Sequence, residues 1–161
     1  MRTRQTSSIV VLASVVGVTW APAAGPAEPD LSLVEEQVLA ANAEMNATAE
    51  SLDVERFFDW ILDEPNASIA QSGRLYRDRA EAKAAVEAGY NGVQSLARTF
   101  ERTRVTPVSE DAAVVVAAGT STVVLTDGRT FEAPFAVSLV FVRRDAGWKV
   151  LHGHYSNPAR P

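Results

Sequence analysis

Two histidines, His152 and His154, are the residues whose type and spacing first suggest chemistry. They stand two positions apart in a segment of strand character, so their side chains point to the same face of a sheet. Two imidazoles in this arrangement can chelate zinc or copper, but a working site needs a third ligand. No carboxylate is placed to help, so we expect no metal and assign the pair a structural role. If the strand faces are reversed, either imidazole is a candidate general base.

A cluster of three arginines, Arg74, Arg77 and Arg79, surrounds Asp78 ahead of a predicted helix. These arginines could meet an anionic group of a substrate, although such charges more commonly form a solvated rim. The chain has no cysteine, which excludes disulfides, thiolate metal sites and a cysteine nucleophile. It also lacks a phosphate-binding glycine loop, a nucleophile elbow and a dinucleotide fingerprint. We therefore expect no cofactor.

The first half of the chain is predicted to supply helices that position these residues. Ser32 and Glu35 have the spacing of a capping box, and apolar residues at helical spacing follow them, which predicts one long amphipathic helix. Asp53 can cap a second, shorter helix that Pro65 stops. Asp78 can cap a third helix.

The second half of the chain has strand character. Two short strands are expected around Ser72-Gly73, and Asp127-Gly128 and Asp145-Ala146-Gly147 are hairpin turn signals. The longer β-branched runs are Arg104 to Val108, Ala112 to Leu125, Thr130 to Arg143 and Trp148 to Ser156. Helices first and an antiparallel meander after them predict an α+β domain with its helices packed on one face of the sheet.

The first thirty residues are typical of an export signal. Arg2 and Arg4 form a basic region, an apolar run from Ile9 to Val18 follows, and Ala21-Pro22-Ala23 offers small residues to a signal peptidase. The apolar run is shorter than the roughly 20 residues that span a bilayer. We predict a signal peptide over 1–23, a flexible leader over 24–30, one domain over 31–157 and a tail over 158–161. The mature protein is then secreted or periplasmic, with no membrane attachment.

The charge of the chain argues against polyanionic partners. With 15 basic and 20 acidic residues the net charge is −5, and loss of Arg2 and Arg4 makes it −7. A nucleic-acid-binding domain normally carries a basic patch, so we expect no nucleic acid partner.

The C-terminal third carries a family resemblance. Its residues are Glu110-Asp111-Ala112-Ala113 before a strand, Arg143-Arg144-Asp145 with Gly147 at the last hairpin, and the run Trp148 to Ser156 that ends His-x-His-x-Ser. Together with three helices ahead of it, this stretch resembles the nuclear transport factor 2-like superfamily. Within that superfamily it is most similar to SnoaL-like domains and to the association domain of calcium/calmodulin-dependent kinase II. The resemblance implies a cone, in which a strongly curved antiparallel sheet wraps around the long N-terminal helix and two shorter helices.

The resemblance also implies a cavity between the sheet and the helices. Strand alternation and the helix faces direct a mostly apolar set of residues toward it. The expected ligand-binding residues are Phe57, Tyr90, Gly119, Phe135, Leu139, Phe141 and Tyr155. The kinase association domain carries basic residues at the positions that correspond to Gly119, Leu139 and Tyr155. The absence of basic residues at these three positions argues against an anionic ligand bound as the kinase association domain would bind it. The alternative is that these residues form only the core between sheet and helices.

Three functions remain open at this point. The first is an exported domain that binds a small, mostly apolar ligand. The second, which the resemblance implies, is an acid–base isomerase, cyclase or dehydratase with Asp59 as base and Tyr90 or Tyr155 opposite it. The third is a non-catalytic assembly module. Alternation places an apolar set on the outer face of the sheet, which predicts a homodimer through that face: Val114, Val116, Val124, Val140, Val142, Trp148 and Val150.

Overall fold

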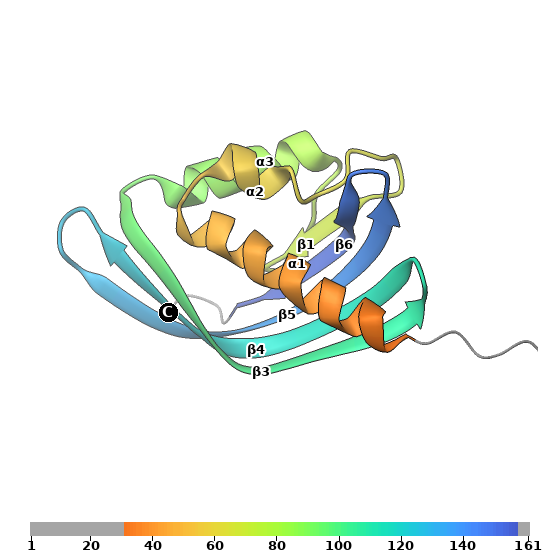
Figure 1. Cartoon of the computed structure of the whole chain (residues 1–161). Helices are drawn as coiled ribbons and strands as arrows, with labels where there is room; N and C mark the ends of the chain where they lie inside the picture. Colours follow the sequence, from red (N-terminus) through yellow and green to blue (C-terminus); the bar gives the residue numbers. More distant parts are fainter. Residues whose placement is uncertain (1–30, 158–161) are drawn as a thin grey trace, which may run out of the picture.

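The computed structural model describes residues 31–157, in which three helices lie on the concave side of one curved six-stranded sheet (Figure 1). Helix α1 spans Ser32–Glu50, α2 spans Val54–Phe58 and α3 spans Arg79–Tyr90. Helix α1 crosses the concave face, and α2 and α3 lie above it. The predicted fold class, a curved sheet around one long and two shorter helices, is confirmed.

Two of the three predicted helix starts are confirmed by their capping hydrogen bonds. The Asp53 carboxylate accepts from the Arg56 amide at 3.1 Å, and the Asp78 carboxylate accepts from the Glu81 amide at 2.7 Å. The capping box at Ser32 is wrong, because Ser32 already lies in α1 and the N-cap is Leu31, which has no side-chain acceptor.

The strands have the order β2-β1-β6-β5-β4-β3 in the sheet. Their bounds are β1 Ser68–Gln71, β2 Arg74–Leu75, β3 Val93–Ser109, β4 Ala112–Leu125, β5 Thr130–Arg144 and β6 Gly147–Ser156. Strand β1 runs parallel to β6, and all other neighbours are antiparallel. The predicted turns are confirmed by positive φ angles at Ser72, Gly73, Gly128 and Gly147. Strand β3 begins at Val93, eleven residues before the predicted β-branched run at Arg104.

A β-bulge at Leu151 changes the faces predicted for the last strand. Val140 pairs with His152 and Phe141 pairs with Val150, so Leu151 has no partner on β5. The extra residue reverses the alternation, and Trp148 and Val150 point into the core, where they are 7% and 0% exposed. The prediction that these two residues lie on the outer face with the histidines is therefore wrong.

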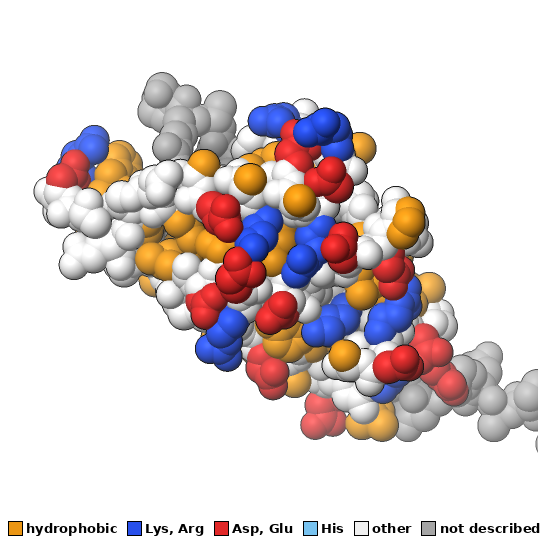
Figure 2. Space-filling view, turned by 90° about the horizontal axis from the view of Figure 1, so that it is seen from above, with side chains coloured by type: hydrophobic (Ala, Val, Ile, Leu, Met, Phe, Trp, Pro, Cys, Tyr) orange, Lys and Arg blue, Asp and Glu red, His pale blue; other side chains and the backbone are white. Residues whose placement is uncertain are grey.

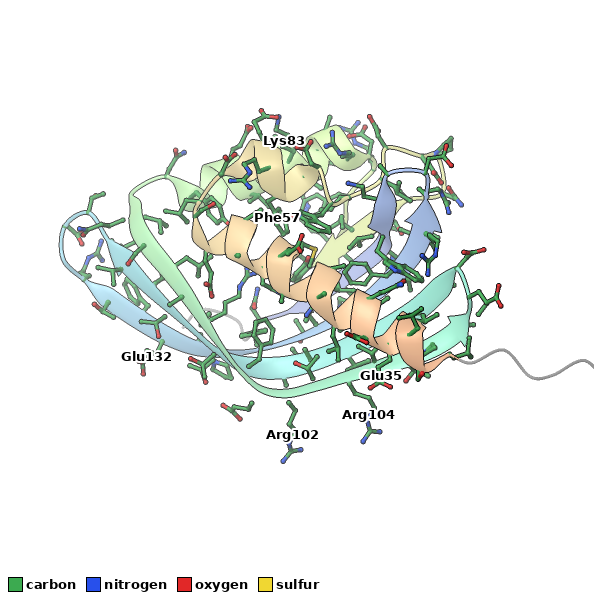
Figure 3. All side chains as sticks on the ribbon, in the orientation of Figure 1. Glu35, Phe57, Lys83, Arg102, Arg104 and Glu132 are labelled. Atoms are coloured by element: carbon green, nitrogen blue, oxygen red, sulfur yellow. The ribbon has the colours of Figure 1, made fainter. Side chains whose placement is uncertain are left out.

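A second bulge lies in β3. Phe100 pairs with Gly119 and Arg102 pairs with Ala118, which leaves Glu101 without a partner on β4. Leu96 and Phe100 therefore face the helices on one side of the bulge, and Thr103 and Val105 face them on the other. Arg102 and Arg104 point away from the sheet on its convex side (Figure 3).

The core lies between the concave face of the sheet and the helices. Its fully buried large side chains are Val38, Met45, Phe58, Val115, Leu139, Phe141 and Val150. Trp148 closes one end, where its indole N–H donates to Gln37 of α1 at 3.2 Å and the Arg143 guanidinium lies 4.6 Å from its ring centroid. Acidic and basic side chains are interspersed over the helical side of the molecule (Figure 2).

The segments predicted to be a signal peptide (1–23), a leader (24–30) and a tail (158–161) lie outside the described residues. None of the helices described has the length and apolar character needed to cross a membrane.

Candidate functional site

The histidine pair lies on the convex face of the sheet, as alternation predicts. The imidazole Nδ1 of His152 is 2.8 Å from the Ser68 hydroxyl oxygen on the neighbouring strand β1, and His154 is exposed. Within residues 31–157, no cluster of three or more histidine, aspartate or glutamate side chains could hold a metal ion. The hydrogen bond between His152 and Ser68 therefore has a structural role, because it joins β6 to β1.

Asp59 lies in an exposed groove that the two candidate tyrosines do not line. The groove has a volume of about 540 Å³, and Glu44 of α1, Arg56, Trp60 and Lys149 are among its lining residues. Lys149 donates to the Asp59 backbone carbonyl at 2.9 Å, and its ammonium lies 5.4 Å from the Trp60 ring centroid. The structure does not bring the Asp59 carboxylate together with a tyrosine.

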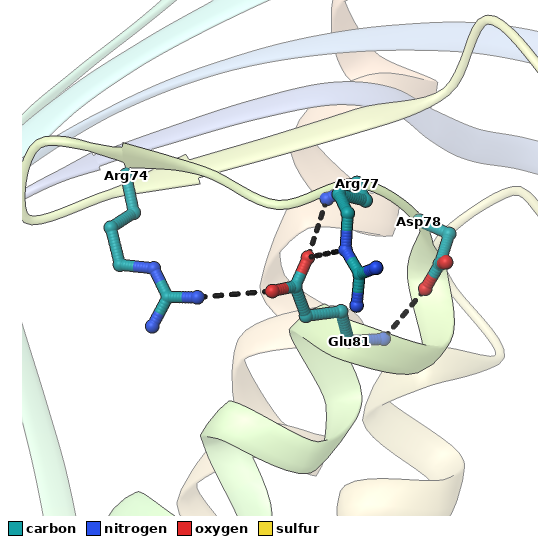
Figure 4. A network of polar contacts seen from close by, with 4 residues as sticks. All are labelled: Arg74, Arg77, Asp78 and Glu81. Atoms are coloured by element: carbon teal, nitrogen blue, oxygen red, sulfur yellow. Dashed lines mark hydrogen bonds and ion pairs between the residues drawn. The ribbon is translucent and has the colours of Figure 1, made fainter.

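The arginines around Asp78 are occupied within the fold. Arg74 and Arg77 both pair with Glu81, at 3.0 Å and 3.3 Å (Figure 4). The hydrogen bond from the Arg77 backbone amide is the main reason why the pKa of the half-buried Glu81 carboxyl is lowered. Arg79 donates to the carbonyl oxygens of Phe58 and Ile61, at 2.6 Å and 3.1 Å. These contacts anchor α3 to the segment before it.

Three of the predicted ligand-binding residues are buried in the core. Phe57, Leu139 and Phe141 are 5%, 1% and 0% exposed and belong to the same packed cluster. Figure 3 shows Phe57 below α2, directed toward α1. The deep part of the predicted chamber is therefore filled by side chains.

Gly119 is required by a close approach of two strands. A Cβ at this position would lie 1.9 Å from the Thr99 carbonyl oxygen, beside the bulge at Glu101. The missing side chain also lets Phe100 of β3 and Phe135 of β5 meet across β4, with ring centroids 5.3 Å apart in an edge-to-face arrangement. Both rings are half-buried, so this aromatic pair forms the boundary between the core and solvent on the concave side.

Tyr155 carries a buried polar atom that the fold does not satisfy. Its hydroxyl is buried and has no hydrogen-bond partner among the described residues. Burial raises the pKa of Tyr155 to about 12, partly opposed by the charge of Arg98. An unpaired buried hydroxyl costs roughly 1–3 kcal/mol, so its presence requires an explanation.

Tyr90 lies near this hydroxyl, at the end of α3. Its own hydroxyl donates a long hydrogen bond of 3.4 Å to the Ala49 carbonyl oxygen of α1. Burial also raises the pKa of Tyr90, again opposed by the charge of Arg98. Both phenols are therefore neutral hydrogen-bond donors near neutral pH, and neither is a base.

Arg98 is the residue of this cluster that sequence reasoning missed. It follows Leu96 and precedes Phe100 on the concave side of β3, and its guanidinium donates to the Asn46 side-chain oxygen of α1 at 3.2 Å. Its backbone amide donates to the exposed Glu50 carboxylate at 2.7 Å. β character was expected from Ser95 onward, and the alternation of Leu96, Arg98 and Phe100 was the available signal, but the predicted β-branched run began only at Arg104.

Tyr90, Arg98 and Tyr155 together form a site of hydrogen-bond donors, which we name the phenol–arginine cluster. The charge of Arg98 acts on both phenols, and the half-buried rings of Phe100 and Phe135 flank the cluster on the same concave face. Such a site can hold an oxygen acceptor and an apolar body. No aspartate or glutamate within residues 31–157 is buried, so none of these carboxylates is held there to abstract a proton.

Comparison with known proteins places the chain in a family. A model of the SnoaL-like domain family matches residues 38–160. No curated protein matches the chain.

Several solved structures share the fold. A nuclear transport factor 2-like superfamily protein from Salmonella enterica superposes with a TM-score of 0.71 at 18% identity, covering 81% of this chain and 95% of that one. A protein from Xanthomonas campestris, described as a candidate calcium/calmodulin-dependent kinase II association domain, has a TM-score of 0.67 at 18% identity and covers 86% and 95%.

A candidate dehydratase of the same superfamily from Streptomyces avermitilis has a TM-score of 0.70 at 18% identity and covers 81% and 100%. Identities this low support the fold alone. The family match and the shared fold together confirm the predicted resemblance: the chain belongs to the SnoaL-like domain family of the nuclear transport factor 2-like superfamily.

Proposed function

We propose that this SnoaL-like domain binds a small, mostly apolar ligand at the phenol–arginine cluster. The observation that carries the proposal is the buried Tyr155 hydroxyl, which has no partner within the described chain. A ligand oxygen at this point would accept its hydrogen bond and remove the free-energy cost of the unpaired donor. The half-buried rings of Phe100 and Phe135 supply an apolar surface beside it.

Binding is better supported than acid–base catalysis. The two tyrosines of the cluster have raised pKa values, and the candidate base Asp59 lines a different, exposed groove. A proton-abstracting site would instead need a carboxylate within hydrogen-bond reach of the substrate. Because Leu139 and Phe141 fill the deep part of the cone, the ligand lies at its wide end, next to the aromatic pair.

The test is a titration of the full-length protein with N-phenyl-1-naphthylamine, an uncharged aromatic probe whose fluorescence rises in apolar surroundings. We expect saturable one-to-one binding that weakens at least tenfold in Phe135→Ala, because truncation removes on the order of 100 Å² of apolar contact at about 25 cal/mol per Å². Phe131→Ala is the matched control, since Phe131 is on the same strand but half exposed near the hairpin turn. Absence of saturable binding, or equal losses in both variants, would contradict the proposal.

We also propose that the mature protein works outside the cytoplasm. The basic region, the short apolar run and the small residues Ala21 and Ala23 support this assignment. N-terminal sequencing of protein recovered from the producing cells is expected to begin at Ala24. A start at Met1 would contradict it.

A homodimer through the convex face of the sheet is the third part of the proposal. Val114, Val116 and Val140 lie near the centre of that face, and Val116 is 50% exposed. With Trp148 and Val150 buried in the core, this apolar patch is smaller than the sequence predicts. Arg102 and Arg104 flank it on β3 (Figure 3).

A further inference from the structure

Arg98 is a half-buried cation without an anionic partner. Within residues 31–157, its guanidinium makes one hydrogen bond, to the neutral amide oxygen of Asn46, and no ion pair within 4.0 Å. Arg144, by contrast, forms a two-point pair with the carboxylate of Glu64, at 2.9 Å and 3.0 Å. Most of the hydrogen-bonding capacity of the Arg98 guanidinium, which has five N–H donors, is therefore unused.

The groups that share the concave face with Arg98 are donors as well. The Tyr155 hydroxyl is unpartnered, and the Tyr90 hydroxyl makes only its 3.4 Å contact with the Ala49 carbonyl. The phenols of Tyr90 and Tyr155 and the guanidinium of Arg98 thus share one face, and their hydrogen-bonding capacity is not fully used by acceptors within residues 31–157. The Glu50 carboxylate is exposed and accepts a hydrogen bond from the backbone amide of Arg98.

We infer that the ligand of the phenol–arginine cluster carries a carboxylate, which accepts hydrogen bonds from the Arg98 guanidinium and the Tyr155 hydroxyl while its apolar body lies against Phe100 and Phe135. This inference rests on the proposed function. A single cation matches a monoanion, and a planar guanidinium matches the two oxygens of a carboxylate. The sequence predicted that an anionic ligand is disfavoured because positions 119, 139 and 155 carry no basic residue. Arg98 supplies the positive charge from a different strand.

The test compares two probes of the same shape, 2-naphthoate and 2-naphthamide, against the full-length protein by calorimetry at neutral pH. A charge-assisted hydrogen bond favours the naphthoate by roughly 10- to 100-fold. Arg98→Gln is expected to abolish this preference while the affinity for naphthamide stays within about threefold. Tyr155→Phe is expected to weaken both probes, because the hydroxyl donates to either oxygen.

Arg104→Gln is the matched control, because Arg104 is on the same strand but points away from the convex face (Figure 3). Equal affinity for the two probes, or an unchanged preference in Arg98→Gln, would overturn the inference and leave the proposed function intact. If naphthoate does not bind while N-phenyl-1-naphthylamine does, the inference also fails alone. If none of the three probes binds, the proposed function fails and the inference with it.

Discussion

Because the Tyr155 hydroxyl is unpaired, we predict that its removal stabilises the ligand-free protein. In Tyr155→Phe the ring stays in its place beside Gly153, where its Cε2 atom lies 3.1 Å from the point that a Cβ on residue 153 would occupy, and only the unsatisfied hydroxyl is lost. Because an unpaired buried donor costs roughly 1–3 kcal/mol, we expect a gain of about 1 kcal/mol in the free energy of unfolding. This gain corresponds to a rise in Tm of about 4 °C for a domain of this size.

Urea or thermal unfolding of the ligand-free protein at neutral pH measures this change. Tyr90→Phe is the matched control, since the Tyr90 hydroxyl has a carbonyl partner at 3.4 Å. Loss of that long hydrogen bond is expected to destabilise the protein by about 0.5 kcal/mol. The two Tyr→Phe changes should therefore have opposite signs.

Tyr155 also makes the free energy of unfolding depend on pH above about pH 10. The pKa of Tyr155 is about 12 in the folded protein, above the value of about 10 for an unfolded chain. Between these values the unfolded chain binds fewer protons than the folded one, so the stability falls as the pH rises through this window. The difference of about two units between the folded and unfolded pKa values corresponds to a loss on the order of 2–3 kcal/mol in the free energy of unfolding by pH 12. The Tyr155→Phe variant should not show this loss.

Two results would refute this reasoning. If Tyr155→Phe destabilises the protein by 1 kcal/mol or more at neutral pH, the hydroxyl has a partner in the folded protein, such as an ordered water molecule. If the stability curves of wild type and Tyr155→Phe stay parallel above pH 10, burial of the phenol does not control its titration.

Three further predictions concern the scaffold. Gly119→Ala is expected to cost at least about 2 kcal/mol in unfolding experiments, because its Cβ would meet the Thr99 carbonyl, whereas Gly89→Ala, with open space in α3, should be neutral or stabilising by up to about 1 kcal/mol. Asp53→Ala should cost about 1 kcal/mol through loss of the α2 cap, and an unchanged Tm would contradict this role. Val116→Lys should convert the proposed dimer to a monomer in sedimentation velocity, and a wild-type monomer at micromolar concentration would exclude that dimer.

Local signals in the sequence predicted most of the fold correctly. Asp53 and Asp78 were recognisable as caps because a short carboxylate ahead of an apolar helical pattern has few other roles. Gly128 and Gly147 marked hairpins because the turns require positive φ. These features depend on residues a few positions apart, so no tertiary information was needed.

The site was predicted less well because its residues depend on long-range pairing. The assignment of Tyr90 and Tyr155 to a ligand site stays a prediction, whereas Phe57, Leu139 and Phe141 were assigned to a chamber that the core occupies. Strand alternation gives the face of a residue, and it cannot tell whether the space in front of that face is filled. The partner that fills it comes from another element of the fold.

The bulges at Glu101 and Leu151 explain why the phenol–arginine cluster lies on this face. Without the bulge, with Glu101 in regular alternation, the pattern that points Val105 inward would turn Arg98 to the convex side of β3. Without the bulge, with Leu151 in regular alternation, the pattern that buries Val150 would turn Tyr155 outward on β6. Both polar groups thus reach the concave face because a bulge interrupts the alternation of the strand, and bulges are common next to functional sites. A core needs neither an unpaired phenol nor a guanidinium without an anionic partner, so the placement of both by bulges supports the proposed ligand over packing alone.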